Sequence, residues 1–411
     1  MSLTFEQKLK RYADLSIKVG VNLREGQRLL LSAPIECTNI TRQVTISAYQ
    51  AGASFVDVLW DDDILKRIRF QHAPHDSFEL FPSWVIDRTL RAIERGDSLL
   101  SIYAPDPDVL QGLDTDLIAI AQRTAQTHNS AIAKHLMSNA TSWNAISSPK
   151  KNWAAKVFPD TPHDKQVEKL WDTIFTICRV DRDDPVQAWR NHIKKLQSVT
   201  KRFTAKQYTT LKYLGPNINM TVGLVPGHIW TGGSVISKAN REYLPNIPTE
   251  EVFTTPHMDK AEGTLTSSKP LLYSGQIIDD FSMTFENGHV INFSAKKGEE
   301  TLKNLIETDD GSKRLGEVAL VPHSSPISQS GLLFYNTLYD ENAASHFALG
   351  RAYPFCLDGG PEMSRDELLN VGSNYSLAHV DFMIGSGEMD VDGITADGVT
   401  EPIMRAGEWA F

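Results

Sequence analysis

The sequence predicts two domains: an N-terminal α/β domain with a doubly wound, mostly parallel sheet, and a C-terminal α+β domain that is largely antiparallel. The chain has 411 residues, which is too long for one ordinary hydrophobic core. Its first half alternates short apolar runs with helical patterns, and strand-like segments predominate from Tyr208 onward. We expect domains at 1–185 and 186–411, with the boundary placed to within about 20 residues.

Composition narrows the class of protein. Hydrophobic residues make up 41% and charged residues 22% of the chain, values typical of a water-soluble globular protein. The formal net charge of −10 argues against nucleic acid or an anionic membrane as a partner, since both attract basic surfaces. No apolar run approaches the roughly 18 residues of a membrane span, and the first 16 residues have a charged amphipathic pattern without a signal-peptide core.

Three cysteines, Cys37, Cys178 and Cys356, are widely spaced and form no CxxC pattern. An odd number of distant cysteines predicts neither a disulfide framework nor a thiolate metal site. We therefore expect a reduced, cytoplasmic protein.

The first half contains three strand patterns, each followed by a helix pattern or a short loop. Gly52 and Gly96 follow two of the helix patterns and are good stop signals. Such alternation predicts a parallel sheet with helices on both faces. The expected strands are 27–31, 54–60 and 98–103, and the expected helices are 39–51, 64–71 and 84–95. The sequence has no GxGxxG and no GxxxxGK[ST] motif, so nothing indicates a nucleotide phosphate as ligand.

A helical stretch at 163–206 leads into the second half. There, Asn287-Gly288 between two alternating runs is the strongest short-range signal of a β-hairpin. Asp392-Gly393 and Asp397-Gly398 are expected to form further turns. The expected strands are 208–214, 217–222, 264–273 and 277–293, and one helix is expected at 298–308.

Residues suited to hold a metal ion lie in the second half. His379 and Asp381 precede an apolar run and belong to a predicted strand, so their side chains point to one side. Imidazole nitrogen and carboxylate oxygen suit zinc, cobalt or manganese. The candidates are Glu250, Glu251, Glu317, His346, Tyr353, His379 and Asp381.

Each candidate also has an ordinary structural reading. Adjacent glutamates are usually solvated, Glu317 could lie at an exposed strand end, and a lone histidine such as His346 is more often a packing residue. A helix running on from His346 would place Tyr353 on the same face, but Gly350 and Pro354 argue against such a helix.

Two rival patterns contain histidine. HxD recurs at His257-Met258-Asp259, and HxxH occurs at His72 to His75. Context favours His379, because His257 follows Pro256 in an expected loop. The patterns alone leave the choice open.

Four segments together resemble the aminopeptidase T / aminopeptidase S family of dinuclear metallo-aminopeptidases, which lack an HExxH motif. The segments are NIPTEEVFTTP, GEVALVP, NTLYDENAASHFALG and HVDFMIGS, and the opening YADLSIKVGVNLREGQRLLLSAP with AYQAGASFVDVLW is also similar. The resemblance covers essentially the whole chain. It implies two divalent metal ions, with zinc first and cobalt, manganese or magnesium as alternatives.

The resemblance also assigns roles by position. Its metal-binding carboxylates fall on Glu251 and Glu317, the histidine after DENAxSH on His346, and the closing HxD on His379 and Asp381. The active-site tyrosine falls on Tyr353, and Glu250 becomes a candidate general base. His257 and His72 match no ligand of the family. Asp340 and Asn342 are candidates for orienting ligands.

The function expected from this resemblance is removal of the N-terminal residue from peptides with a free amino terminus, by a homodimeric cytoplasmic enzyme. Two other classes remain open. One is a metallo-hydrolase of a different amide, and the other is a non-enzymatic α/β protein that binds a small molecule.

Overall fold

The computed structural model describes the chain apart from residues 1–2, 105, 107 and 275. Met1 and Ser2, at the start of the predicted N-terminal helix, therefore lie outside the described residues. Two compact units are present: Met1–His192 with Ser234–Pro248, and Ile193–Gly233 with Thr249–Phe411. We call them unit 1 and unit 2. Residues 234–248, which fall within the range expected for the second domain, pack with unit 1.

Unit 1 contains a four-stranded sheet in the order β2-β1-β3-β4. Its strands are β1 (Arg28–Pro34), β2 (Phe55–Asp61), β3 (Ser98–Tyr103) and β4 (Trp143–Ser147). All three pairings are parallel, which confirms the parallel sheet predicted from the alternating patterns. The predictions gave three of these strands and did not anticipate β4.

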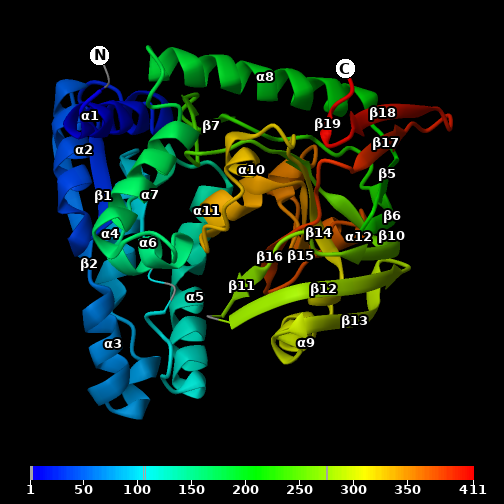
Figure 1. Cartoon of the computed structure of the whole chain (residues 1–411), viewed down its shortest axis with the longest axis horizontal. Coiled ribbons are helices and arrows are strands. Elements are labelled where there is room, and N and C mark those ends of the chain that lie inside the picture. Colours follow the sequence, from blue (N-terminus) through cyan, green and yellow to red (C-terminus); the bar gives the residue numbers. More distant parts are fainter. Residues whose placement is uncertain (1–2, 105, 107, 275) are drawn as a thin grey trace. The chain divides into compact units, whose positions relative to one another are not determined.

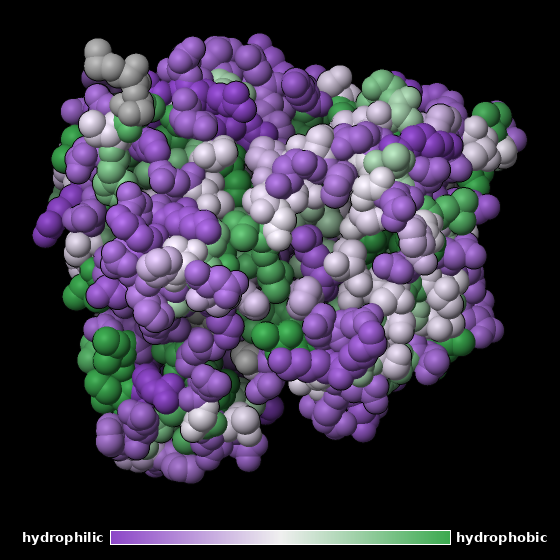
Figure 2. All heavy atoms as spheres, viewed as in Figure 1, coloured by the Kyte–Doolittle hydropathy of each residue, from purple (hydrophilic) through white to green (hydrophobic). Residues whose placement is uncertain are grey.

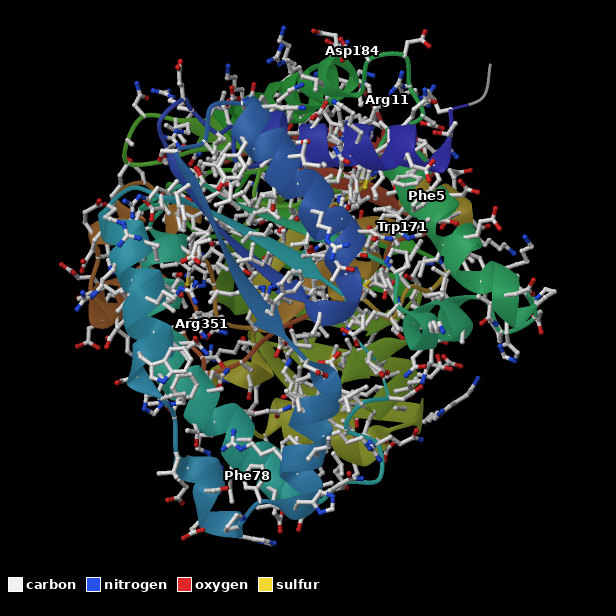
Figure 3. All side chains as sticks on the ribbon, turned by 90° about the vertical axis from the view of Figure 1, so that its left-hand side faces the viewer. Phe5, Arg11, Phe78, Trp171, Asp184 and Arg351 are labelled. Atoms are coloured by element: carbon white, nitrogen blue, oxygen red, sulfur yellow. The ribbon has the colours of Figure 1, made fainter. Side chains whose placement is uncertain are left out.

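Helices pack against this sheet. Ala92 and Ile93 of α4 form a buried cluster with Leu30 and Leu99 of the sheet, and α2 lies across the strands in Figure 3. The aromatic rings of Phe5 and Trp171, whose centroids are 5.7 Å apart, lie side by side in the same view. The main helices are α1 (Phe5–Leu15), α2 (Thr38–Gln50), α3 (Asp63–His72), α4 (Ser83–Glu94), α5 (Thr115–Met137), α6 (Lys151–Val157) and α7 (His163–Ile177).

The long helix α5 was not predicted from the sequence. Of its residues only Leu117 is fully buried, and Ile132 and Leu136 pack partly buried against the cluster described above, so the apolar face of this helix is narrow. The predicted stretch 163–206 is two helices, because α8 (Pro185–Lys206) follows α7 after a break. None of the described helices is long and apolar enough to cross a membrane.

Unit 2 has a nine-stranded sheet whose pairings are antiparallel. The predicted hairpin is confirmed: Asn287 and Gly288, with φ of 50° and 80°, connect two of its strands. The strands are β5 (Thr210–Gly215), β6 (Ile218–Leu224), β10 (Pro256–Thr266), β11 (Leu271–Tyr273), β12 (Gln276–Glu286), β13 (His289–Lys297), β17 (Asp390–Ile394), β18 (Thr400–Arg405) and β19 (Glu408–Trp409).

Two local predictions in this sheet are wrong. Asp392-Gly393 is not a turn but lies within β17. Glycine is required at position 393 because a Cβ there would lie 2.6 Å from the ring of Tyr208. His257 is likewise in a strand, β10, rather than in a loop. Asp397-Gly398 does form a turn, with a φ of 84° at Gly398.

A second, four-stranded sheet of unit 2 has the order β16-β15-β14-β9. Its strands are β9 (Val252–Thr254), β14 (Leu315–Leu320), β15 (His346–Gly350) and β16 (His379–Met383). Val318, Phe347 and Phe382 pair across it and belong to the hydrophobic core. One face of this sheet is therefore packed into the core, and side chains that alternate with these residues lie on the other face.

The segment after His346 is thus a strand, so the helix considered for His346 to Tyr353 does not form. The β-branched and aromatic pattern that usually marks a strand is weak here. The strand contains one aromatic residue, Phe347, and one leucine, Leu349, but no β-branched residue. Short helices complete unit 2: α9 (Glu299–Ile306), α10 (Pro326–Ser330), α11 (Thr337–Asp340) and α12 (Arg365–Asn370).

Candidate metal centre

The second face of the four-stranded sheet carries the candidate metal ligands. Glu317 of β14 and Asp381 of β16 both pair with Ala348 of β15, so these three residues form one row across the sheet. His346 is two residues before Ala348, and His379 is two residues before Asp381. Because side chains two apart on a strand share a face, all four candidates lie on the face opposite the core.

Small residues separate these ligands. Ala319 pairs with His346, Ala348 lies between Glu317 and Asp381, and Gly350 pairs with His379. Each has a side chain of one carbon or none, so no long side chain occupies the middle of this face. The sheet thus leaves space where the imidazole and carboxylate groups converge. We call the face carrying these residues the metal face.

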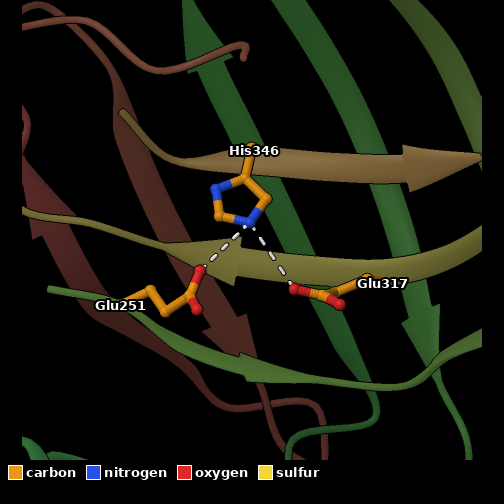
Figure 4. A group of neighbouring side chains, drawn as sticks. All are labelled: Glu251, Glu317 and His346. Carbon is orange, nitrogen blue, oxygen red and sulfur yellow. Dashed lines mark ion pairs between the residues drawn. The ribbon is translucent and has the colours of Figure 1, made fainter. Parts of the chain in front are cut away.

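Three side chains form the first group. Nε2 of His346 lies 3.2 Å from an oxygen of Glu251 and 3.5 Å from Oε1 of Glu317. Figure 4 shows the imidazole between the two carboxylates. All three residues are buried, and their ligand atoms lie within 4.8 Å of one another.

The second group shares Glu317 with the first. Nε2 of His379 lies 3.5 Å from Oε2 of Glu317 and 3.4 Å from Oδ1 of Asp381. Glu317 therefore directs one oxygen to each histidine, the arrangement of a carboxylate that bridges two ions. Oδ1 of Asp381 is buried, and its contact with Nε2 of His379 is too long and poorly aligned for a good hydrogen bond, so this oxygen is available to a cation.

The two histidines are oriented alike by the backbone. Nδ1 of His346 lies 3.1 Å from the carbonyl oxygen of Ala344, and Nδ1 of His379 lies 2.6 Å from that of Arg351. Donation of Nδ1–H to a carbonyl leaves Nε2 available to a metal and fixes the ring. The donor set of two imidazole nitrogens and three carboxylates fits a pair of divalent ions.

Comparisons with known proteins agree with this geometry. The family model described as thermophilic metalloprotease (M29) matches residues 5–409. The chain belongs to the M29 metalloprotease family. It is 47% identical to aminopeptidase 2 of Geobacillus stearothermophilus over 99% of this chain and 98% of that protein. It is 43% identical to aminopeptidase AmpS of Bacillus subtilis, with 99% and 100% coverage.

A solved structure has the same fold. Wild-type AmpT from Thermus thermophilus superimposes with a TM-score of 0.95 at 38% identity, over 99% of this chain and 100% of that one. The resemblance to the aminopeptidase T / aminopeptidase S family is therefore confirmed across the chain.

Tyr353 lies beside the second group of candidate ligands. Its ring centroid is 4.6 Å from that of His379. Burial raises the pKa of Tyr353 well above its usual value, and the charges of Glu317 and Asp381 raise it further. The phenol therefore keeps its proton and can act as a hydrogen-bond donor.

Glu341 is a fourth acidic group at the site, and the sequence analysis missed it. Burial raises its pKa well above the usual value, and the charges of Glu251 and Asp381 add to the effect. The signal was present, because Glu341 is the glutamate of the DENAxSH motif whose histidine was selected. The prediction included only its neighbours Asp340 and Asn342.

Those two neighbours support the backbone. The side-chain oxygen of Asn342 accepts the N–H of Glu250 at 2.7 Å, which ties the Glu250-Glu251 segment to the loop before β15. Asp340 accepts the N–H groups of Phe334 and Asn336 at 2.7 and 2.9 Å. Glu250 itself is buried.

The rival histidines lie elsewhere. Nδ1 of His257 accepts the N–H of Asp259 at 3.2 Å on β10. His72 ends helix α3 in unit 1, and both histidines are outside the two groups that the described residues form.

Metal-free protein should release protons when it binds metal. Burial alone would lower the pKa of His379, but the charge and hydrogen bond of Asp381 and the charge of Glu317 raise that pKa to about 9. At neutral pH the imidazole is therefore protonated and must lose its proton to become a ligand. We expect the affinity for Zn²⁺ to rise with pH until about pH 9 and then to level off.

Calorimetric titration in buffers of different ionisation enthalpy measures the protons released. We expect fewer protons per chain at about pH 9.5 than at about pH 7, because both His379 and Glu317 lose protons over this range. His379→Gln should reduce that difference, whereas His289→Gln, on β13 in the other sheet, should keep it. The same proton count at both pH values in the unmodified protein would contradict the assignment.

Proposed function

We propose that this M29 protein is a metallo-aminopeptidase that removes the N-terminal residue of peptides at a site for two divalent metal ions, zinc first. The proposed ligands are Glu251, Glu317, His346, His379 and Asp381. The observation that carries the proposal is the position of Glu317, whose two oxygens face His346 and His379 separately. Cobalt, manganese or magnesium would fit the same nitrogen and oxygen donors less specifically.

Two bound ions would lower the pKa of a coordinated water, polarise the scissile carbonyl and accept the free α-amine of the substrate. The protein's own contribution begins with Tyr353. Its phenol keeps its proton and can donate a hydrogen bond to the oxyanion that develops on the carbonyl. Such a bond strengthens in the transition state and so raises kcat.

A carboxylate must also accept a proton and return it to the leaving amine. Glu250 is the sequence-based candidate. However, Glu251 faces His346, and neighbouring residues of an extended segment point to opposite sides, which turns Glu250 away. Glu341 acts electrostatically on Tyr353, and burial with the charges of Glu251 and Asp381 raises its pKa in the metal-free protein; bound cations would favour the ionised carboxylate that proton acceptance requires. We assign the role to Glu341 and retain Glu250 as its competitor.

Paired substitutions separate the two carboxylates. Glu341→Gln should lower kcat by roughly 10²–10⁴-fold with the metal content unchanged, whereas Glu250→Gln should have a smaller effect. Metal content is measured by elemental analysis and kcat on a leucyl p-nitroanilide. The reverse order of effects would transfer the role to Glu250.

The activity itself is tested with and without chelator. Purified protein should hydrolyse aminoacyl p-nitroanilides and dipeptides, lose activity on chelation and regain it with Zn²⁺ or Co²⁺. N-acetylated substrates should not be cleaved, because they lack the free amine. Equal cleavage of blocked and free peptides would identify a hydrolase of another amide, and inactivity toward both would leave a non-enzymatic binding protein.

We also propose that two copies of the chain associate through the surface of α3 in unit 1. None of the ten residues of this helix is buried, and Ile64 and Leu65 are 65% and 63% exposed. Apolar side chains gather in Figure 2 where Figure 1 places α3, and a patch of this kind is typical of an interaction surface. Sedimentation should give the mass of a dimer, and Ile64→Asp should give the monomer.

A cytoplasmic location is supported by the cysteines. Cys37, Cys178 and Cys356 are all buried free thiols. Free, buried cysteines suit a reducing compartment, where thiols are kept unpaired.

A further inference from the structure

Three aromatic rings form a cluster beside the metal ligands. The rings of Tyr353 and Phe355 are stacked, with centroids 5.1 Å apart. Phe253 meets both of them in an edge-on arrangement, at 6.0 Å from Tyr353 and 6.2 Å from Phe355. We call Phe253, Tyr353 and Phe355 the aromatic corner.

The register of the sheet places this corner on the metal face. Phe253 of β9 pairs with Ala319, and Ala319 pairs with His346, so the phenylalanine shares a row with one ligand. It also follows Glu251 by two residues. At the other side, the ring of Tyr353 contacts that of His379.

The corner differs from the aromatic residues of the opposite face. Phe347 and Phe382, on the same sheet, are at most 1% exposed and belong to the core. Phe253, Tyr353 and Phe355 are each partly exposed. Partly exposed, stacked aromatic side chains offer apolar contact area to a ligand.

The backbone holds the corner in place. Phe253 exchanges both of its backbone hydrogen bonds with Thr231, each at 2.8 Å. The carbonyl oxygen of Tyr353 accepts the N–H of Cys356 at 3.0 Å and the hydroxyl of Thr255 at 3.4 Å. A wall built in this way is preorganised and costs little to order when a ligand binds.

We propose that Phe253 and Phe355 form the wall that receives the side chain of the substrate's N-terminal residue, and that they select for uncharged apolar side chains. The inference rests on the proposed aminopeptidase function, in which the α-amine is held at the metal ligands. The side chain of the N-terminal residue is attached to the carbon atom that carries this amine. It must therefore lie close to the metal ligands, beside which the aromatic corner is placed.

The chemistry of the wall sets the preference. When an apolar side chain binds, its contacts with water are replaced by contacts with aromatic rings. Each methylene group bound in such a pocket changes kcat/KM by about 10–200-fold. A carboxylate side chain would lose its hydration against rings that offer no hydrogen-bond donor. Leucine and phenylalanine substrates should therefore be cleaved faster than alanine substrates, and glutamate substrates slowest.

The test compares leucyl with alanyl p-nitroanilide for each variant. In Phe253→Ala and Phe355→Ala, the ratio of the two kcat/KM values should fall by roughly 10–100-fold, mainly through the leucyl substrate. Phe253→Trp should also lower the ratio, because the larger ring narrows the space available to the leucyl side chain. Phe293→Ala removes a partly buried aromatic ring from β13, in the other sheet of unit 2, and should leave the ratio unchanged.

Metal content and the thermal midpoint are measured for each variant alongside kinetics. Equal loss of activity on both substrates in Phe253→Ala, with metal retained, would show that the ring only supports Tyr353 and would overturn the proposal. An unchanged ratio in both Phe253→Ala and Phe253→Trp would also overturn it. In either case, activity of the unmodified protein would leave the proposed function standing, whereas its inactivity on every substrate would overturn that function instead.

Discussion

Glu317→Gln is expected to remove both metal ions and to lower kcat/KM by about 10³-fold or more, since loss of an outer-shell group alone typically costs 10–100-fold. Glu317 is the residue shared by the two groups of ligands. Glutamine has the same shape as glutamate but carries no charge and has only one side-chain oxygen, so it cannot supply an oxygen ligand to both groups. Elemental analysis and kinetics on one preparation measure the two losses together.

The same variant should also change the stability of the metal-free protein. Burial raises the pKa of Glu317 to about 7 from its usual 4.5, although His346 lowers it. A carboxyl group with a raised folded-state pKa contributes stability that is present below about pH 4.5 and is lost as the pH rises through about 7. Metal-free Glu317→Gln should therefore gain thermal stability relative to the unmodified protein at about pH 8 and not at about pH 4.

Glu286→Gln, at the exposed end of β12, is the matched control and should leave metal content, activity and stability unchanged. Retention of two ions by Glu317→Gln would disprove the bridging role. Retention of one ion would show instead that the two groups bind independently.

Tyr353→Phe is expected to retain the metal ions and to lower kcat by roughly 10²–10³-fold, as does removal of one oxyanion donor. The variant loses only the hydroxyl, while the ring can keep its contact with His379. KM should change little, because the missing hydrogen bond forms mainly in the transition state.

Tyr375→Phe, a partly buried tyrosine of unit 2 that stacks on Arg365, is the matched control and should keep full kcat. Burial raises the pKa of Tyr353 in the metal-free protein, which favours the protonated phenol that the donor role requires. Loss of metal in Tyr353→Phe would mean that the phenol is a ligand, and its role as a donor would be wrong.

The sequence predicted elements well where local signals were strong. β3 was placed with its observed bounds, 98–103, and the Asn287-Gly288 hairpin formed because both residues tolerate positive φ. The prediction failed where tertiary packing decided. Asp392-Gly393 resembles a turn, but the ring of Tyr208 requires glycine inside β17.

The site was harder to predict than the fold because its members converge through strand register. Ala348 aligns Glu317 with Asp381, yet the sequence separates these two acids by more than sixty residues. Spacing alone identified His379 and Asp381 as a local pair, and the family resemblance supplied Glu251, Glu317 and His346. Glu341 was missed because the DENAxSH motif that contains it was used only to select its histidine, His346.

The small residues on the metal face determine how this enzyme can be damaged. Ala319 and Ala348 are completely buried, so any atom added to either side chain would occupy the space among the ligands. We expect an alanine-to-valine change, which adds two methyl groups and needs one nucleotide change, to lower activity while every proposed ligand remains in place. Inactive variants in this family should therefore be sought among substitutions by larger residues on the metal face as well as among substitutions of the ligands.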